Sequence, residues 1–163
     1  MPSHRETRIV PFTAEQMFAV VADVERYPEF VPGCVGLRVR NREADGAVEY
    51  ITAEMLVAYH GLRERYVSRV RLDQEAHTIE ARHVEGAFDH LDTRWRFTPE
   101  GEGARVEFSI DFAFKSRLLS AVAGLAFDNI VRRMADAFFA RAAKLYGPLQ
   151  QTAEQAKRGI DRS

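Results

Sequence analysis

The chain has 163 residues, of which 46% are hydrophobic and 29% are charged, a balance that is typical of one globular domain. A net charge of −1 gives no general attraction for nucleic acid, so no DNA partner is expected. The single cysteine, Cys34, excludes an intrachain disulfide and a cysteine-based metal site. Because no apolar run reaches the roughly 20 residues of a membrane span and the first ten residues lack a signal-peptide core, a cytoplasmic location is expected.

The N-terminal residues are expected to form a strand and then a helix. The stretch HRETRIV at 4–10 is typical of a strand. Thr13 and Gln16 have the spacing of a capping box, which predicts that a helix begins at this point. The apolar stretch at 17–21 supplies the buried face of that helix.

A proline-broken segment, ADVERYPEFVPGC, follows at 22–34. Pro28 disfavours helical geometry at Tyr27, so the segment is predicted to hold at most a short second helix and a loop. Tyr27, Phe30 and Val31 nevertheless give it apolar side chains that a surface loop would not need.

Residues 35–114 have the two-residue period of strands, which predicts about six antiparallel strands after the first one. The clearest is RVEFSIDFAF at 105–114, where apolar and polar residues alternate strictly and therefore define one buried and one solvated face. Both faces of the strand at 47–59 carry apolar groups, so its inward face is not fixed by the sequence. Turn signals separate the strands at 43–46, 60–61, 85–89 and 100–103.

A long helix is predicted over 115–147, with Ser116 as its cap and Gly147 followed by Pro148 as its end. Residues 1–147 are therefore expected to form the domain, and residues 148–163 a flexible polar tail. The most economical packing is an α+β fold in which a curved antiparallel sheet of about seven strands holds the helix. Leftover concave apolar surface between them would form a hydrophobic cavity.

Four stretches in this order resemble the coenzyme-Q-binding family of START-like, helix-grip domains, whose bacterial members are also described as ribosome-association toxins. They are ADVERYPEFVPGC, HGLRERYVSRV, FDHLDTRWRF and the region from VEFSIDFAFKSRLL to RRMADAFFARAAKLYG. The resemblance covers residues 4–147. It implies a START/Bet v 1-like helix-grip fold with a tunnel between sheet and helix, ubiquinone or another polyprenyl lipid as ligand, and a role that supports respiration.

Periodicity and the resemblance together suggest which residues line the cavity. The expected lining residues are Tyr27, Phe30, Val31, Tyr66, Val70, Trp95, Phe108, Ile110, Phe112, Leu118, Leu119, Val122, Ile130 and Met134. Tyr27 and Phe30 are expected to act as a lid at the cavity mouth, opposite Leu118, Leu119 and Val122. The alternative is that these two rings are core side chains beneath a loop.

No catalytic residue is predicted. The five histidines lack metal-ligand spacing, and no nucleophile, phosphate-loop or dinucleotide motif occurs, so neither a metal nor a cofactor is expected. Glu54 lies within an apolar strand and would need an arginine partner if buried. A polyketide cyclase-like enzyme remains an alternative, which would require an acid or base in the cavity.

Arginines on the outward strand faces are candidates for a surface contact. Arg38, Arg40, Arg94 and Arg96 could bind ribosomal RNA or an anionic inner membrane, on which the protein would then lie peripherally. The alternative is a solvated face that acidic residues of neighbouring strands neutralise. We therefore expect a non-enzymatic carrier of ubiquinone or a similar lipid, with inhibition of ribosome association through the large subunit as the other function.

Overall fold

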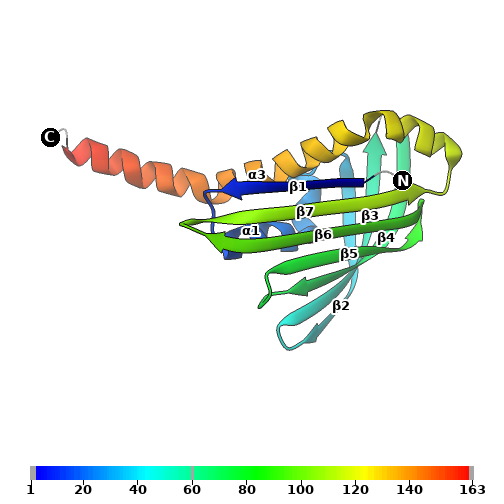
Figure 1. The fold of residues 1–163 in the computed structure, drawn as a ribbon, viewed down its shortest axis with the longest axis horizontal. Helices are drawn as coiled ribbons and strands as arrows, with labels where there is room; N and C mark the ends of the chain where they lie inside the picture. Colours follow the sequence, from blue (N-terminus) through cyan, green and yellow to red (C-terminus); the bar gives the residue numbers. More distant parts are fainter. Residues whose placement is uncertain (1–2, 60, 162–163) are drawn as a thin grey trace.

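A curved antiparallel sheet and one long helix dominate the fold (Figure 1). The computed structural model describes the backbone of residues 3–59 and 61–161, and their side chains apart from those of residues 119, 122–127 and 148–161. The elements are β1 (Ser3–Val10), α1 (Ala14–Ala22), the 3₁₀ turn η1 (Val24–Arg26), α2 (Tyr27–Phe30), β2 (Cys34–Asp45), β3 (Val48–Tyr59), β4 (Leu62–Asp73), β5 (Thr78–Gly86), β6 (Phe88–Glu100), β7 (Gly103–Phe114) and α3 (Arg117–Asp161). This order confirms the predicted helix-grip fold class.

The N-terminal helix begins at the predicted cap. The Thr13 hydroxyl accepts a hydrogen bond from the Gln16 N–H at 3.1 Å, and the Gln16 side chain accepts one from the Thr13 N–H at 2.9 Å. These two bonds satisfy two N–H groups that have no partner within the helix. The proline-broken segment then forms η1 and the four-residue α2, as predicted.

The sheet brings the two ends of the strand sequence together. Its order is β1-β7-β6-β5-β4-β3-β2, so β1 pairs with β7, the last strand to be made (Figure 1). Val10 lies opposite Ala104, and Ser3 lies opposite Asp111. Gly103 lies at the start of β7, where a Cβ atom would come within 2.0 Å of the Val10 carbonyl oxygen. A glycine is therefore needed at this position for the two strands to approach.

The strands bury the faces that their alternation predicts. Trp95 in β6 and Phe112 in β7 are buried, at 5% and 7% exposure, which confirms the predicted register. The structure also settles the face of β3 that the sequence left open. Ile51 and Ala53 are buried in the core, and Glu54, the residue after Ala53, lies on the outer face, where it pairs with Arg40.

The long helix α3 begins after Ser116, as predicted, and lies against the sheet (Figure 1). Val131, Ala135, Phe138 and Ala142 form its buried stripe. Its predicted end is wrong, because α3 continues to Asp161 instead of ending at 147–148. Proline lacks one N–H but its fixed φ is close to the helical value, so a helix can continue through it with one hydrogen bond fewer. That residues 1–147 form the domain and residues 148–163 a flexible polar tail stays a prediction.

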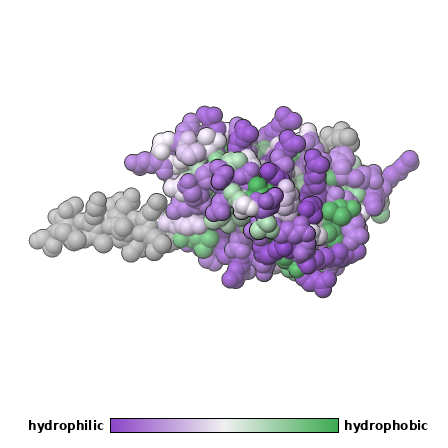
Figure 2. Space-filling view, turned by 90° about the horizontal axis from the view of Figure 1, so that it is seen from below, coloured by the Kyte–Doolittle hydropathy of each residue, from purple (hydrophilic) through white to green (hydrophobic). Residues whose placement is uncertain are grey.

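Within the described part of the chain, no helix is both long enough and apolar enough to cross a bilayer. Seen from below relative to Figure 1, this face of the molecule is mostly hydrophilic, and apolar side chains appear as separate small patches (Figure 2).

Candidate ligand-binding site

A largely apolar cavity of about 440 Å³ lies between α3 and the inner face of the sheet. Its volume is in the range of small-molecule sites. The described lining residues are Val31, Pro32, Gly33, Cys34, Met55, Val57, Ala58, Tyr59, Leu62, Glu64, Tyr66, Phe88, Leu91, Ile110, Phe112, Phe114, Ile130, Val131, Arg133 and Met134. The wall is therefore built by the segment after α2, the β3–β4 hairpin, strands β6 and β7, and the middle of α3.

Six of the residues expected from the sequence line this cavity. They are Val31, Tyr66, Ile110, Phe112, Ile130 and Met134. They come from four separate parts of the chain, which the sheet and α3 bring together.

The other expected residues lie elsewhere. Val70, Trp95 and Phe108 are buried in the core and do not line the cavity. Leu118, in the first turn of α3, is 68% exposed. The side chains of 119 and 122, both expected at the mouth, lie outside the described residues.

Tyr27 and Phe30 do not lie at the expected place. Their rings pack edge to face on Phe138, with centroids 5.3 and 5.4 Å from its ring. Leu118 lies twenty residues earlier in α3, about 30 Å along the helix axis. The expected position opposite Leu118 is therefore wrong. Both rings belong to α2, are partly buried and pack against the hydrophobic core. Of the three residues expected from this segment, Val31, the next residue after α2, is the one that lines the cavity.

Several lining residues were missed by the sequence analysis. Met55 and Val57 were missed because the face of β3 was not fixed, and they follow Ile51 and Ala53 on the inward side. Phe88 was assigned to a turn, although it is the first residue of β6. Alternation could not have indicated it, because an irregularity in the pairing of β6 with β7 between Phe88 and His90 puts Phe88 out of step with the inward Leu91.

Aromatic rings form one wall of the cavity. Phe88 packs edge to face on Tyr66 at 5.1 Å and stacks on Phe114 at 4.6 Å. The Tyr66 hydroxyl donates to the Met55 sulfur at 3.0 Å, and burial raises the pKa of this hydroxyl. The hydroxyl of Tyr66 therefore already has a protein partner within the wall.

Two further titratable groups adjoin this wall. Burial raises the pKa of the Cys34 thiol, which donates to the Gly36 carbonyl oxygen at 3.7 Å, so the thiol is held in its neutral form. His83 packs on Phe88 at 5.6 Å, and burial lowers its pKa. Its Nε2 atom is buried and has no hydrogen-bond partner among the described residues.

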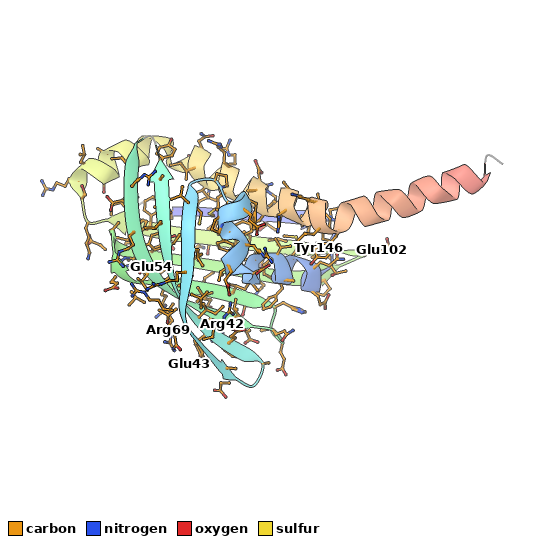
Figure 3. All side chains as sticks on the ribbon, turned by 180° about the vertical axis from the view of Figure 1, so that it is seen from behind. Arg42, Glu43, Glu54, Arg69, Glu102 and Tyr146 are labelled. Atoms are coloured by element: carbon orange, nitrogen blue, oxygen red, sulfur yellow. The ribbon has the colours of Figure 1, made fainter. Side chains whose placement is uncertain are left out.

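The arginines of the outer face divide into two groups. Several on β2 and β4, such as Arg42 and Arg69, lie among acidic side chains that include Glu43 and Glu54 (Figure 3). Arg40 pairs with Glu54 and, at 3.2 Å, with Glu85; Arg65 also reaches Glu54, at 3.1 Å. Arg42 pairs with Glu49 at 2.8 Å, and Arg69 with Glu43 at 3.7 Å. The hydrogen bond from Arg40 lowers the pKa of Glu54.

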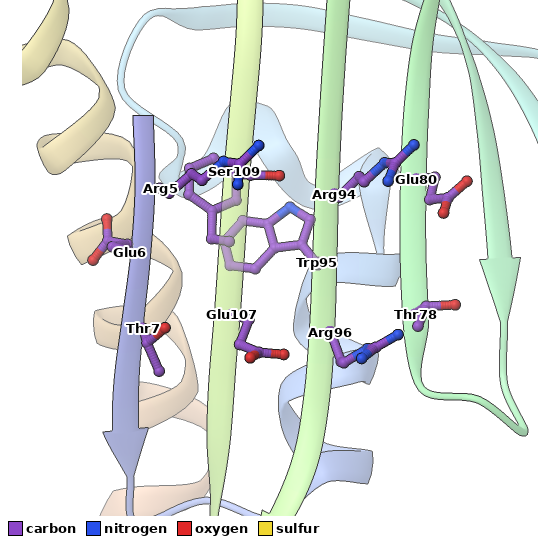
Figure 4. Close-up of a pocket in the computed structure, with 11 residues that line it drawn as sticks. Arg5, Glu6, Thr7, Thr78, Glu80, Arg94, Trp95, Arg96, Glu107 and Ser109 are labelled. Carbon is purple, nitrogen blue, oxygen red and sulfur yellow. The ribbon is translucent and has the colours of Figure 1, made fainter. Parts of the chain in front are cut away.

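The other arginines make no ion pair with a described residue. They include Arg38 on β2 and Arg94 and Arg96 on β6, three of the four arginines expected as a surface contact. The last two lie with Arg5 in an open depression of about 630 Å³ on the outer face (Figure 4). Glu80 and Glu107 are their cross-strand neighbours. Arg38 lies four strands away, roughly 19 Å at ordinary strand spacing, so the expected row of arginines is not continuous.

The curved sheet, the long helix and the apolar cavity between them define a helix-grip, START-like domain. Residues 10–139 match the family described as polyketide cyclase / dehydrase and lipid transport, and the chain belongs to this family.

Two curated relatives and one solved structure are similar over most of the chain. The ribosome association toxin RatA of Escherichia coli (strain K12) is 35% identical over 147 residues, 90% of each chain. The mitochondrial coenzyme Q-binding protein COQ10 homolog B of Xenopus laevis is 35% identical over 149 residues, 88% of this chain and 59% of that protein. The solution structure of the 18 kDa protein CC1736 from Caulobacter crescentus has 43% identity and a TM-score of 0.75, covering 90% of this chain and 99% of the other. These findings confirm the resemblance that the sequence motifs indicated.

Proposed function

We propose that the protein binds ubiquinone or a similar polyprenyl lipid beneath α3 and carries it without catalysing a reaction. The observation that carries this proposal is the apolar cavity of about 440 Å³. Similarity to a protein named as coenzyme Q-binding supports the choice of lipid.

The driving force is the removal of apolar surface from water. At about 25 cal/mol per Å², a prenyl chain that buries about 300 Å² would gain roughly 7 kcal/mol before the entropy cost of association. Such a ligand needs a dry wall and no catalytic group, which agrees with the rings of Phe88, Phe112 and Phe114.

The cavity chemistry favours a carrier over a cyclase. A poly-keto chain would present several carbonyl groups and would need donors distributed along the wall. The Tyr66 hydroxyl donates to the Met55 sulfur, and the Cys34 thiol donates to a backbone carbonyl. Among the described lining residues, the charged side chains are Glu64 and Arg133 alone.

Mass spectrometry of lipids extracted from the purified protein tests this proposal. A polyprenyl lipid in stoichiometric amount is expected from the wild type. Ile130→Glu places a carboxylate on the cavity wall and should lower the lipid content at least ten-fold. The matched control is Asn129→Glu, on the preceding, exposed position of α3, which should leave the lipid content unchanged. Wild-type protein without polyprenyl lipid, or equal content in both variants, would contradict the proposal.

A second proposal is that the protein binds the large ribosomal subunit and inhibits subunit association. Similarity to RatA over 90% of both chains supports it, together with the arginines of the outer depression that form no ion pair with a described residue (Figure 4). Phosphate groups of RNA would bind such side chains in a salt-dependent manner.

Co-sedimentation with ribosomes at several salt concentrations tests this second proposal. Arg94→Glu combined with Arg96→Glu should weaken binding and reduce the log–log salt slope by about 1.5 to 2. Arg38→Glu, at the far edge of the sheet, is the matched control and should change neither. Arg40 is unsuitable because it pairs with Glu54 and Glu85. Binding that is indifferent to charge reversal and to salt would exclude this face as the contact.

A further inference from the structure

Two charged side chains interrupt the otherwise apolar wall of the cavity. Glu64 reaches it from β4, and Arg133 reaches it from α3. Glu64 is partly exposed and Arg133 is exposed, so both lie where the cavity meets solvent. Neither forms an ion pair with another described residue.

Both charges belong to the faces that build the cavity. Leu62, Glu64 and Tyr66 alternate along β4, so their side chains share one side of the strand. Arg133 follows Ile130 by three residues, which places the two on one face of α3. The cavity therefore has a carboxylate on its sheet side and a guanidinium on its helix side, each on an otherwise apolar face.

A charge without a partner is tolerated at such a place only because water still reaches it. The cavity consequently has a dry interior, with Ile110 and Phe112, and a polar rim. An amphiphilic ligand would lie with its tail inside and its head at the rim.

We propose that Glu64 and Arg133 form a head-group site, and that it prefers a head that both donates and accepts hydrogen bonds, such as a hydroquinone or a prenylated phenol, over a quinone. A guanidinium only donates and an ionised carboxylate only accepts. Quinone carbonyls only accept, so a quinone can bond Arg133 alone. A hydroquinone can accept from Arg133 and donate to Glu64. This inference rests on the proposed lipid-binding function.

Three probes with the same short prenyl tail test the inference: a benzoquinone, its hydroquinone kept reduced under anaerobic conditions, and the hydrocarbon without a head. Equilibrium binding to the wild type should favour the hydroquinone over the quinone by about five- to ten-fold, a modest factor because the rim is wet. Glu64→Gln replaces an acceptor by an amide that also donates, so the preference should fall below about two-fold.

Arg133→Met should weaken binding of both the quinone and the hydroquinone at least five-fold and leave the hydrocarbon unaffected. Arg132→Met is the matched control, since Arg132 is exposed on α3 and does not line the cavity. If the wild type binds the tailed probes without preferring the hydroquinone, the head-group site is wrong while lipid binding stands. The same conclusion follows if Glu64→Gln and Arg133→Met both bind the probes like the wild type. If the wild type binds none of the three probes, the carrier function itself is wrong.

Discussion

Phe138 connects α3 to the segment after α1, and replacing it tests the packing of this region. The side chain is 2% exposed. The rings of Tyr27, Phe30 and Trp95 surround it at 5.3, 5.4 and 5.1 Å. Truncation of a buried phenylalanine to alanine costs about 3–5 kcal/mol. Each lost aromatic pair is worth about 0.5–1.5 kcal/mol beyond its area, so the cost of Phe138→Ala should lie near the upper end, about 4–5 kcal/mol.

Urea-induced unfolding, followed by far-ultraviolet circular dichroism, measures this cost. With a slope of about 2 kcal/mol per molar, the midpoint should fall by roughly 2 M. Phe138→Leu is the matched control, because it retains most of the volume and loses the ring pairs, and it should cost about 1.5–3 kcal/mol. A loss below about 1.5 kcal/mol for Phe138→Ala, or equal losses for both variants, would refute the proposed ring cluster.

Two further predictions concern pH and the first helix. Burial and then Lys115 lower the pKa of His83, against the opposing influence of Asp89 and Glu85. The folded state keeps this ring neutral while the unfolded state takes up a proton below about pH 6.5, so stability is complete above that pH and is lost as the pH falls toward the lower folded pKa. The urea midpoint should therefore decrease when the pH is lowered from 7.5 to 5.5, and it should decrease less in His83→Phe. An equal decrease in the wild type and in this variant would contradict the role of His83. Thr13→Ala should cost about 1 kcal/mol and Thr13→Ser much less, as thermal unfolding can measure, and equal losses would exclude the side-chain cap as the cause.

Local signals predicted most of the fold. The Thr13–Gln16 pair fixed the start of α1, and the alternation from Val106 to Phe112 fixed the inward face of β7. The face of β3 was not predictable because Tyr50 and Leu56 offer the outer face as much apolar surface as Ile51 offers the inner one. There the choice depends on pairing with β4, which no local pattern contains.

The candidate site was less predictable than the fold. Ile110 and Phe112 follow from alternation, because every inward residue at that end of β7 meets the cavity. The position of Tyr27 does not follow from its neighbours in sequence. Which turn of α3 it meets depends on how the helix crosses the sheet, and the structure places it against Phe138. Aromatic character thus indicated burial correctly but not the burial partner.

The pairing of β1 with β7 has a consequence for synthesis of the chain. Val10 lies opposite Ala104, so β1 leaves the ribosome about a hundred residues before β7, the strand with which it pairs. At about 5–20 residues per second, β1 spends roughly 5–20 s before β7 is available to form its backbone hydrogen bonds. Its polar composition, with Arg5, Thr7 and Arg8 among its eight residues, suits that wait, because charged side chains discourage pairing with other nascent chains. Among the strands of the sheet, β1 is thus the first to be made and among the last to be paired.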